Sequence, residues 1–317
     1  MRRPERLEGP RTAVPADIDR INRVFSEAFT DRYQRDGMSG VRVPMLNPAI
    51  WRFALSAAGE GAMLWHDKAG ELVAFNVVHQ SGSEGWMGPL AVRPGRQGEG
   101  IGGLIVRAGI ERLEACGARV IGLETMPRTV ENIGFYSRLG FRPEHLTVSM
   151  TYEPKQLQHA RADAPPLAEA EERLSECQAL VEELRPGVDF SRELALTLEA
   201  GLGDATLVSE RGSLVAFALW HSAPLAEARS SDELRVLKLA ARSPAAFQRL
   251  LAALEAAAAR VRAHRIAIRC QTAYRSAYGA LLAAGYRVHW TDLRMTLDGK
   301  PEATPPNGGI VFSNWEI

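Results

Sequence analysis

The feature that most constrains the fold of this chain is an internal repeat. Glycines and an apolar run of the first half recur 142 residues further on, and later positions recur with a shift of 145 residues. A fixed shift over many positions predicts two copies of one structural unit. The repeated positions of the first half are Gly59, Gly61, Gly70, 72–75, His79, 140–142, Met150 and Thr151. Their counterparts are Gly201, Gly203, Gly212, 214–217, His221, 285–287, Met295 and Thr296.

The composition is that of a globular protein with room for two cores. The chain has 317 residues, and Lys+Arg equals Asp+Glu at 38 each, so bulk charge indicates neither a nucleic-acid nor a membrane partner. The first ten residues lack the apolar segment of a secretory signal, and no apolar run is long enough to span a bilayer. Three scattered cysteines predict reduced thiols, so we expect a cytoplasmic protein.

The first copy alternates short strands and helices in a recognisable order. Apolar spacing, glycines and prolines predict a short strand near residue 12 with a helix to residue 29, and then a loop over 31–48. We expect helices over 51–58, 101–116 and 130–139, and strands over 62–66, 72–79, 86–92, 120–125 and 145–152. We place domain boundaries at 1–153, at 154–185 for a linker with the first helix of the next copy, and at 186–317.

A glycine-rich stretch follows the third of these strands. The strand stops at Pro94, a polar turn with several glycines comes next, and an amphipathic helix begins near Ile101. A strand, a glycine turn and a helix start together direct free backbone N–H groups and a positive helix end at a phosphate. Residues 89–103 are therefore predicted to hold a phosphate-bearing ligand.

Two motifs around this stretch resemble those of one acetyltransferase superfamily. Gln97-x-x-Gly100-x-Gly102 resembles the acyl-CoA pyrophosphate loop of the GNAT superfamily, and residues 132–141 resemble its N-x-x-x-Y-x-x-x-G-F segment. The rival reading is a dinucleotide fingerprint, Gly98-x-Gly100-x-x-Gly103, with Glu124 downstream. That reading is weaker, because residues 93–97 separate these glycines from their strand.

The resemblance implies an α/β fold with a mixed (α+β) sheet and two tandem GNAT domains. It implies an N-acetyltransferase that moves an acetyl group directly from acetyl-CoA, as co-substrate, to a primary amine of a small molecule or peptide. The alternatives are a non-catalytic acyl-CoA-binding regulatory module and an NAD-binding Rossmann-type protein. A homodimer stays open. The implied cofactor-binding residues are Leu90, Ala91, Val92, Arg96, Gln97, Gly98, Gly100, Ile101, Gly102, Gly103, Asn132 and Tyr136.

The same resemblance makes Tyr136 the residue that protonates the leaving thiolate of CoA. The acceptor ammonium must also lose a proton, and Glu124 and Glu84 are the candidate bases, with a water relay as an equal alternative. His79 recurs as His221 in the second copy, which favours a structural role. No cluster of His and Cys residues has the spacing of a metal site.

The second copy lacks the glycines of the loop. Gln97, Gly100 and Gly102 fall on Ser243, Ala246 and Gln248. We therefore expect this copy to be structural or to help form the acceptor pocket, which the loop over 31–48 should border. Residues 310–317 have strand chemistry, and we expect them to add an edge strand to one sheet.

Overall fold

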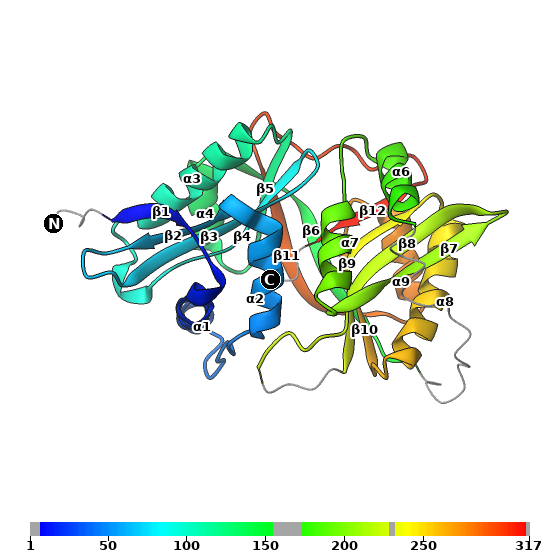
Figure 1. Cartoon of the computed structure of the whole chain (residues 1–317), viewed down its shortest axis with the longest axis horizontal. Helices are drawn as coiled ribbons and strands as arrows, with labels where there is room; N and C mark the ends of the chain where they lie inside the picture. The colour runs from blue at the N-terminus through cyan, green and yellow to red at the C-terminus, as the bar shows by residue number, and fades with distance from the viewer. Residues whose placement is uncertain (1–6, 155–172, 228–231, 315–317) are drawn as a thin grey trace.

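The computed structural model describes residues 7–154, 173–227 and 232–314, which build one continuous mixed sheet (Figure 1). The sheet has 12 strands, and its order is β1-β2-β3-β4-β5-β11-β6-β10-β9-β8-β7, with β12 paired to β9. Strands of the two sequence halves are therefore neighbours at the centre of a single sheet.

The first half contains a meander, a strand–loop–helix unit, and a strand–helix–strand unit, in the predicted order. Its elements are β1 (Glu8–Thr12), η1 (Pro15–Asp17), α1 (Ile18–Arg35), α2 (Pro48–Ala58), η2 (Gly59–Gly61), β2 (Ala62–His66), β3 (Leu72–Ser81), β4 (Glu84–Val92), η3 (Pro94–Arg96), α3 (Ile101–Ala115), β5 (Val120–Thr125), α4 (Val130–Arg138) and β6 (Phe141–Tyr152).

Helix α1 is longer than the residue pattern predicts. It continues to Arg35, so the expectation that a loop begins at Asp31 is wrong. Side chains four residues apart stabilise this last turn: Arg35 pairs with Asp31 at 2.9 Å, and Arg32 with Asp36 at 2.5 Å. The glycines that suggested a loop come only after this turn.

The second half repeats the order of the first. Its elements are α6 (Leu174–Leu184), α7 (Ser191–Glu199), β7 (Gly203–Glu210), β8 (Ser213–His221), β9 (Glu233–Ala241), α8 (Pro244–Arg260), β10 (Arg265–Gln271), α9 (Arg275–Ala283), β11 (Arg287–Leu297) and β12 (Ile310–Ser313). The helix predicted within residues 154–185 begins at Leu174, and residues 155–172 of that segment lie outside the described residues.

The two halves exchange their last long strands. Strand β11 of the second half lies between β5 and β6, with Arg294 opposite Glu124 and Met295 opposite Leu123. Strand β6 of the first half pairs on its other side with β10, where Met150 lies opposite Ile268. Each half thus completes the sheet of the other, which the residue pattern did not predict.

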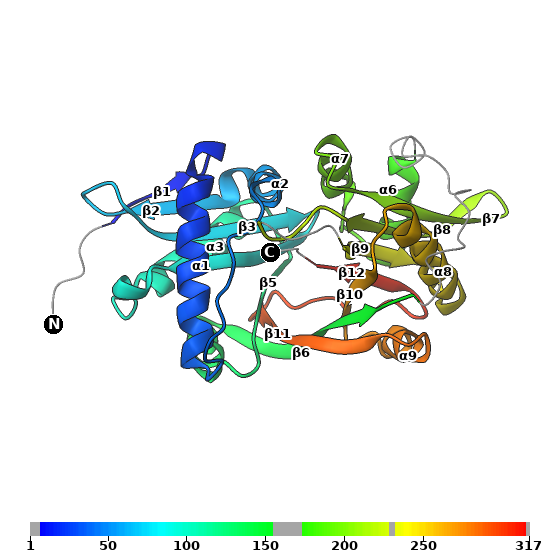
Figure 2. The ribbon, with the colours of Figure 1, turned by 90° about the horizontal axis from the view of Figure 1, so that it is seen from below.

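Helices cover both faces of the sheet in each half (Figures 1 and 2). In the first half, α1 and α2 pack on Leu64, Phe75 and Val77, whereas α3 and α4 pack on the opposite face with Val73 and Leu123. In the second half, α6 and α7 cover one face, and α8 and α9 cover the other. The repeat in the sequence is therefore a repeat in the layers.

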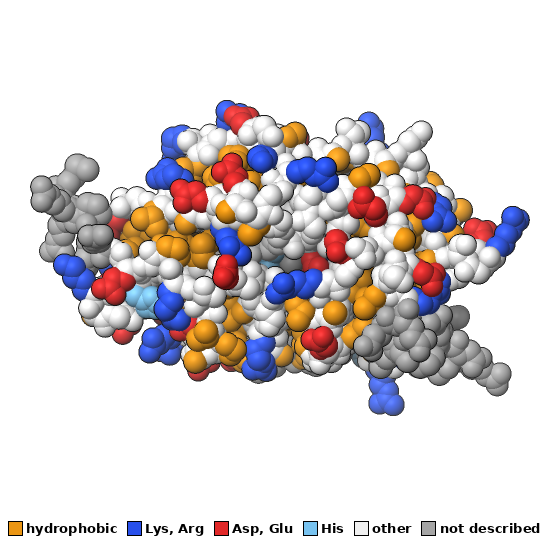
Figure 3. Space-filling view, turned by 45° about the horizontal axis from the view of Figure 1, so that its top comes forward, with side chains coloured by type: hydrophobic (Ala, Val, Ile, Leu, Met, Phe, Trp, Pro, Cys, Tyr) orange, Lys and Arg blue, Asp and Glu red, His pale blue; other side chains and the backbone are white. Residues whose placement is uncertain are grey.

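The surface carries charges of both signs. Figure 3 shows acidic and basic side chains interspersed with apolar ones on one face of the molecule, as the equal numbers of acidic and basic residues predict. Among the described helices, none combines the length and the apolar character needed to cross a bilayer.

Candidate functional site

The candidate site begins where two parallel strands separate. Strands β4 and β5 pair from Glu84 to Met87, and Met87 opposite Leu123 is their last pair. Beyond Met87 the partners of β4 shift register against β3, so Leu90 lies opposite Asn76. The edge of residues 90–92 that faces away from β3 therefore has no strand partner among the described residues. This edge offers backbone groups to an extended ligand.

A buried histidine holds the irregular part of β4. His79 is 1% exposed, and its Nε2–H donates to the carbonyl oxygen of Gly88 at 2.8 Å. Burial lowers the pKa of His79 to about 3, so the ring is neutral and available as a donor. His79 thus contacts the backbone at the point where the strands separate, as a structural histidine does.

The glycine-rich loop leaves the start of α3 without a cap. Gly100 is the N-cap residue with φ 82°, and no side chain caps the helix. Within the described residues, the N–H groups of residues 98–103 make no hydrogen bond to another backbone group. Free N–H groups at a helix start form an anion-binding site. The residues present therefore fit a pyrophosphate.

The glycines of this loop are needed for two different reasons. Gly98 and Gly100 have φ values of 83° and 82°, a left-handed conformation that other residues adopt only with strain. A Cβ on either would meet open space. A Cβ on Gly102, in contrast, would lie 3.2 Å from the Phe135 ring of α4. The first two glycines therefore shape the turn, and Gly102 allows α3 to pack on α4.

Side chains of the loop tie it to its surroundings. Gln97 donates through Nε2 to the Val92 carbonyl oxygen at 3.0 Å and accepts from Arg35 of α1 at 3.3 Å. Arg96 pairs with Glu99 at 3.0 Å. Gln97 thus acts on the loop through its side chain, and it links the end of β4 to the last turn of α1.

Tyr136 and Asn132 lie on α4, which packs beside α3. Tyr136 is 7% exposed and contacts the rings of Phe135 and Phe141. Its hydroxyl makes no hydrogen bond to a described residue, and burial raises its pKa to about 12. The phenol therefore keeps its proton at neutral pH. Asn132 donates through Nδ2 to Thr125 Oγ1 at 3.5 Å, at the end of β5.

The two candidate bases of the sequence analysis lie in ion pairs. Glu124 contacts Arg269 and Arg294 of the second half, and Thr147 donates to it. Burial alone would raise the Glu124 pKa, but the two guanidiniums hold it below its ordinary value. Glu84 is 1% exposed, pairs with Arg185 at 2.8 Å, and lies at the opposite end of β4 from the loop. These surroundings favour a structural role for both carboxylates.

Residues of the second half that no motif indicated complete this region. Arg294 of β11 is 1% exposed, and its guanidinium stacks on the Trp86 ring at 3.6 Å. In the sequence Arg294 stands between Leu293 and Met295, but its neighbours in space are set by the exchange of strands.

Comparison with known proteins agrees with this geometry. Residues 20–141 match the model of the acetyltransferase (GNAT) family. The match shows a GNAT-family domain over residues 20–141. A search of curated proteins finds no match. The GNAT match covers β4, the glycine loop, α3, β5 and α4, which are the elements of the candidate site.

Solved structures resemble the whole chain, at identities that establish the fold alone. A putative acetyltransferase from Pyrococcus horikoshii is 18% identical with a TM-score of 0.66, over 97% of this chain and 94% of that one. A tandem GNAT protein from the clavulanic acid biosynthesis pathway is 13% identical with a TM-score of 0.58, over 94% and 100%. Saccharomyces cerevisiae N-myristoyltransferase with bound myristoyl-CoA is 10% identical with a TM-score of 0.62, over 92% and 78%. The chain therefore has the fold of two GNAT halves.

The second GNAT half separates its strands at the same place but fills the opening. Strands β9 and β10 pair up to Val236 opposite Ile268. Beyond that point β12 pairs with β9, with Ile310 opposite Ala241 and Phe312 opposite Leu239. Among the described strands, β12 pairs with β9 alone, so this segment adds a strand to the sheet as expected. Residues 315–317 of the expected strand lie outside the described residues.

The helix start of the second half is also closed. The Ser243 side chain accepts from the Ala246 N–H at 3.1 Å, and Pro244 occupies the first position of α8. A serine cap followed by proline satisfies or removes the N–H groups that would bind an anion. The residues that replace the loop in the second half thus close the start of α8.

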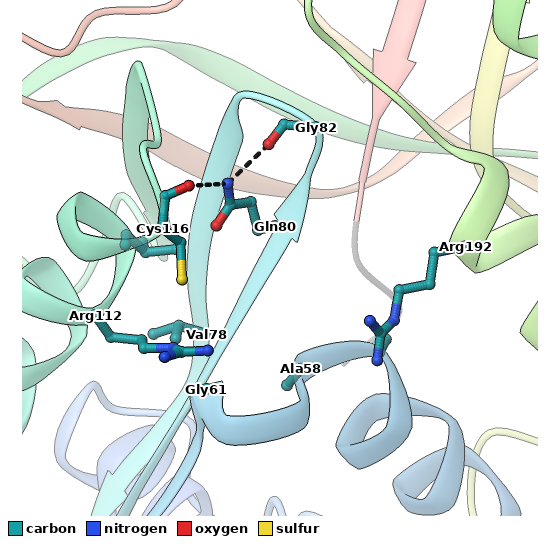
Figure 4. A pocket seen from close by; sticks show the side chains of 10 residues that line it. Ala58, Gly61, Val78, Gln80, Gly82, Arg112, Cys116 and Arg192 are labelled. Atoms are coloured by element: carbon teal, nitrogen blue, oxygen red, sulfur yellow. Dashed lines mark hydrogen bonds between the residues drawn. The ribbon is translucent and has the colours of Figure 1, made fainter.

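A separate cavity lies at the other end of α3. It has a volume of about 310 Å³, and its lining includes Arg112, Cys116 and Arg192 (Figure 4). Gln80 bridges its wall by donating to the carbonyl oxygens of Gly82 and Cys116 at 2.8 and 3.0 Å. The glycine loop does not contribute to this cavity. Among the described residues, no group of three or more His, Cys, Asp or Glu side chains could hold a metal ion.

Proposed function

We propose that the chain is an N-acetyltransferase with one active site, in its N-terminal half. Two observations together carry this proposal: α3 starts without a cap, and the edge of residues 90–92 has no strand partner among the described residues. In the second half, the Ser243 side chain caps the start of α8, and β12 pairs with the corresponding strand edge of β9. One open site within the described part of the chain supports one acetyl-CoA per chain.

The residues of this site suit the parts of acetyl-CoA. The N–H groups of residues 97–103 would hold the pyrophosphate, with Arg96 beside them. The backbone of Leu90, Ala91 and Val92 would pair with the amides of the pantetheine arm, and Asn132 would contact the co-substrate from α4. When bound, acetyl-CoA supplies an activated acyl group as a thioester.

The chain's own groups would then handle the protons. Tyr136, whose pKa is about 12, carries its proton at neutral pH and would deliver it to the departing sulfur. The acceptor is a primary amine of a small molecule or a peptide, and it must lose its proton before it attacks. Glu124 and Glu84 are bound in ion pairs, so the base would be another group of this region or a water molecule.

The first test measures acetyl-CoA binding and thiol release with a panel of small amines. Tyr136→Phe should lower kcat about 100-fold or more while the Kd for acetyl-CoA stays unchanged, because general acid catalysis is worth about 10²–10⁴-fold. Tyr286→Phe, a change at a buried tyrosine of the second half, is the matched control and should leave kcat unchanged. An unaltered kcat in Tyr136→Phe would leave that side chain with a packing role only. Binding of acetyl-CoA without any thiol release would indicate the non-catalytic acyl-CoA-binding module instead.

A further inference from the structure

A chain of ion pairs links the two halves and ends near the candidate site. Glu84 pairs with Arg185 at 2.8 Å, Arg185 with Glu302 at 2.8 Å, Glu302 with Arg294 at 2.6 Å, and Arg294 with Glu124 at 2.6 Å. Arg269 contacts Glu124 and also pairs with Asp292 at 2.9 Å. Among the described residues, carboxylates stand at both ends of this chain, and they outnumber its guanidiniums four to three. Glu302 also lies 3.7 Å from His145 Nε2, but burial lowers the pKa of that imidazole and so disfavours its charged form.

The two ends differ in their access to solvent. The Glu84 side chain is 1% exposed, whereas that of Asp292 is 16% exposed. A cation from solvent can therefore reach the chain at Asp292 but not at Glu84. An ammonium beside Asp292 would continue the alternation of charges and balance the extra carboxylate.

Two aromatic side chains border Asp292. The Trp290 indole Nε1–H donates to Asp292 Oδ1 at 3.1 Å, and the Trp290 ring lies 6.1 Å from the ring of Tyr33 on α1. Both aromatic side chains are partly exposed. Aromatic faces next to a carboxylate are a common way to bind an ammonium, because the ring quadrupole attracts a cation.

Asp292 lies at the end of β5 from which the chain leads to α4. Leu293, its neighbour on β11, lies opposite Thr125, the last residue of β5. Thr125 accepts from Asn132, which precedes Tyr136 by one helical turn. The contact with Tyr33 puts Asp292 and Trp290 on the α1 face of the sheet, while α4 packs on the other face. The sheet layer between α1 and α4 contains the separated strands β4 and β5.

We propose that the acceptor's ammonium binds beside Asp292, next to the Tyr33–Trp290 pair, and that Asp292 takes its first proton. The second half thus contributes a catalytic residue to the site of the first. The extra carboxylate of the ion-pair chain indicates the acceptor class, which is an alkylamine that carries no carboxylate. This inference rests on the proposed acetyl transfer in the N-terminal half.

The proton balance of this step is complete. Asp292 takes one proton from the ammonium, and the neutral amine attacks the acyl carbon, so the C–N bond forms and the C–S bond breaks. Tyr136 gives its proton to the sulfur and regains one from the amide nitrogen. Asp292 then releases its proton to water. The products are the acetamide and the free thiol, with one proton released.

The surroundings of Asp292 suit a base better than those of Glu124. Burial raises the pKa of Asp292, although Arg269 partly opposes the shift. The charged and titratable groups that face Asp292 are Arg269 of β10, Glu124 of β5 and Tyr33 of α1. Because Arg269 is shared with Glu124, Asp292 is held by one guanidinium and Glu124 by two. Asp292 is thus the weaker-bound carboxylate of the two.

The test measures the binding of amines as well as turnover, with the full chain. The probes are 1,4-diaminobutane and 2-phenylethylamine, with 4-aminobutyrate as the acidic counterpart of the diamine. Calorimetry of each probe in the presence of CoA gives a Kd, and thiol release gives kcat/KM against pH. The variant is Asp292→Asn. The matched control is Asp298→Asn, which changes an exposed carboxylate that follows β11 and pairs with Arg142.

We expect the wild type and Asp298→Asn to bind diaminobutane at least tenfold more tightly than aminobutyrate. Asp292→Asn should weaken amine binding about tenfold, lower kcat/KM about 100-fold or more, and remove the acid limb of the pH profile. Its Kd for acetyl-CoA should not change. An Asp292→Asn variant with wild-type amine affinity and an intact acid limb would overturn this inference, as would a wild type that binds none of the amines. If amine binding depends on Asp292 but no thiol is released, the binding site stands and the proposed function fails.

Discussion

The two halves of this chain have the same layers but differ at one equivalent place. Both separate a pair of parallel strands, after Met87 in the first half and after Val236 in the second. In the first half no strand of the described residues fills the opening, and α3 begins at an uncapped glycine. In the second half β12 fills the opening, and Ser243 caps α8. The difference teaches that a fold can be duplicated without an open helix start, because that feature depends on a few local backbone groups.

The largest effect should come from removing the core of β12. Phe312 is 0% exposed and packs on the rings of Phe247 and Tyr274. Phe312→Ala should lower the free energy of unfolding by about 3–5 kcal/mol, because it leaves a cavity in a packed core. Thermal unfolding measures this loss. Val288→Ala, at a residue 49% exposed, is the control and should cost less than about 0.5 kcal/mol.

Phe312→Ala also tests whether β12 alone keeps acetyl-CoA out of the second half. Acetyl-CoA should still bind with a stoichiometry of about one per chain, because Ser243 continues to cap α8. A second molecule bound by Phe312→Ala would show that β12 alone blocks the second opening, and that the helix start contributes little.

A similar but pH-dependent effect is expected at Glu302, which precedes β12. Burial opposes its ionisation, but Arg294 and Arg185 lower the pKa of Glu302 from 4.5 to about 2. A lowered carboxyl pKa stabilises the fold above the unfolded value, and this contribution is lost as the pH falls. We therefore expect unfolding to become easier from about pH 4.5 down towards about pH 2.

Removing this carboxylate tests whether the ion pairs hold β12 in place. Glu302→Gln should cost about 3–5 kcal/mol at neutral pH, because it removes the carboxylate that the buried guanidiniums of Arg185 and Arg294 share. It should also flatten the acid dependence, as measured by urea unfolding at several pH values. Glu210→Gln changes an exposed carboxylate, 57% exposed, and should leave both quantities as in the wild type. Equal acid sensitivity in Glu302→Gln and the wild type would assign the effect to other groups.

The smallest predicted effect distinguishes the loop from an ordinary turn. Gly100 and Gly212 have φ values of 82° and 81°, and a Cβ on either would meet open space. Substitution by alanine at either site should therefore lower the free energy of unfolding by a similar amount, about 1 kcal/mol, through backbone strain. Gly100→Ala should weaken acetyl-CoA binding about tenfold in calorimetry, whereas Gly212→Ala should leave it unchanged. Equal affinities in the two variants would remove the loop from the proposed co-substrate site.

Local features of the fold could be predicted closely. The expected strands over 62–66 and 120–125 are confirmed at β2 and β5, and the helix after the loop is confirmed at α3. Apolar spacing, capping residues and glycines act within a few residues, so they are visible in the sequence. The end of α1 was missed, because i,i+4 ion pairs outweighed the glycines that follow.

The partners of the strands could not be predicted in this way. Nothing in residues 287–297 or 310–313 states which neighbour they take, since a strand can pair with any compatible edge. The proposed base, Asp292, could not be predicted either, because its neighbour Trp290 and Tyr33 lie far apart in the sequence and meet only through the exchanged strand. Glu124 stood out because it ends a strand of the first half, but its partners come from the second.

The sequence by itself determined the duplication, the order of helices and strands in each half, and the glycine turn before α3. These depend on periodicity and on the backbone freedom of single residues, which are local properties. The tertiary structure alone decided that the halves share one sheet, that β12 closes the second opening, and that arginines of one half hold carboxylates of the other. Those outcomes depend on burial and pairing across the whole chain, because the most favourable neighbour of a strand or charge exists only once the chain has folded.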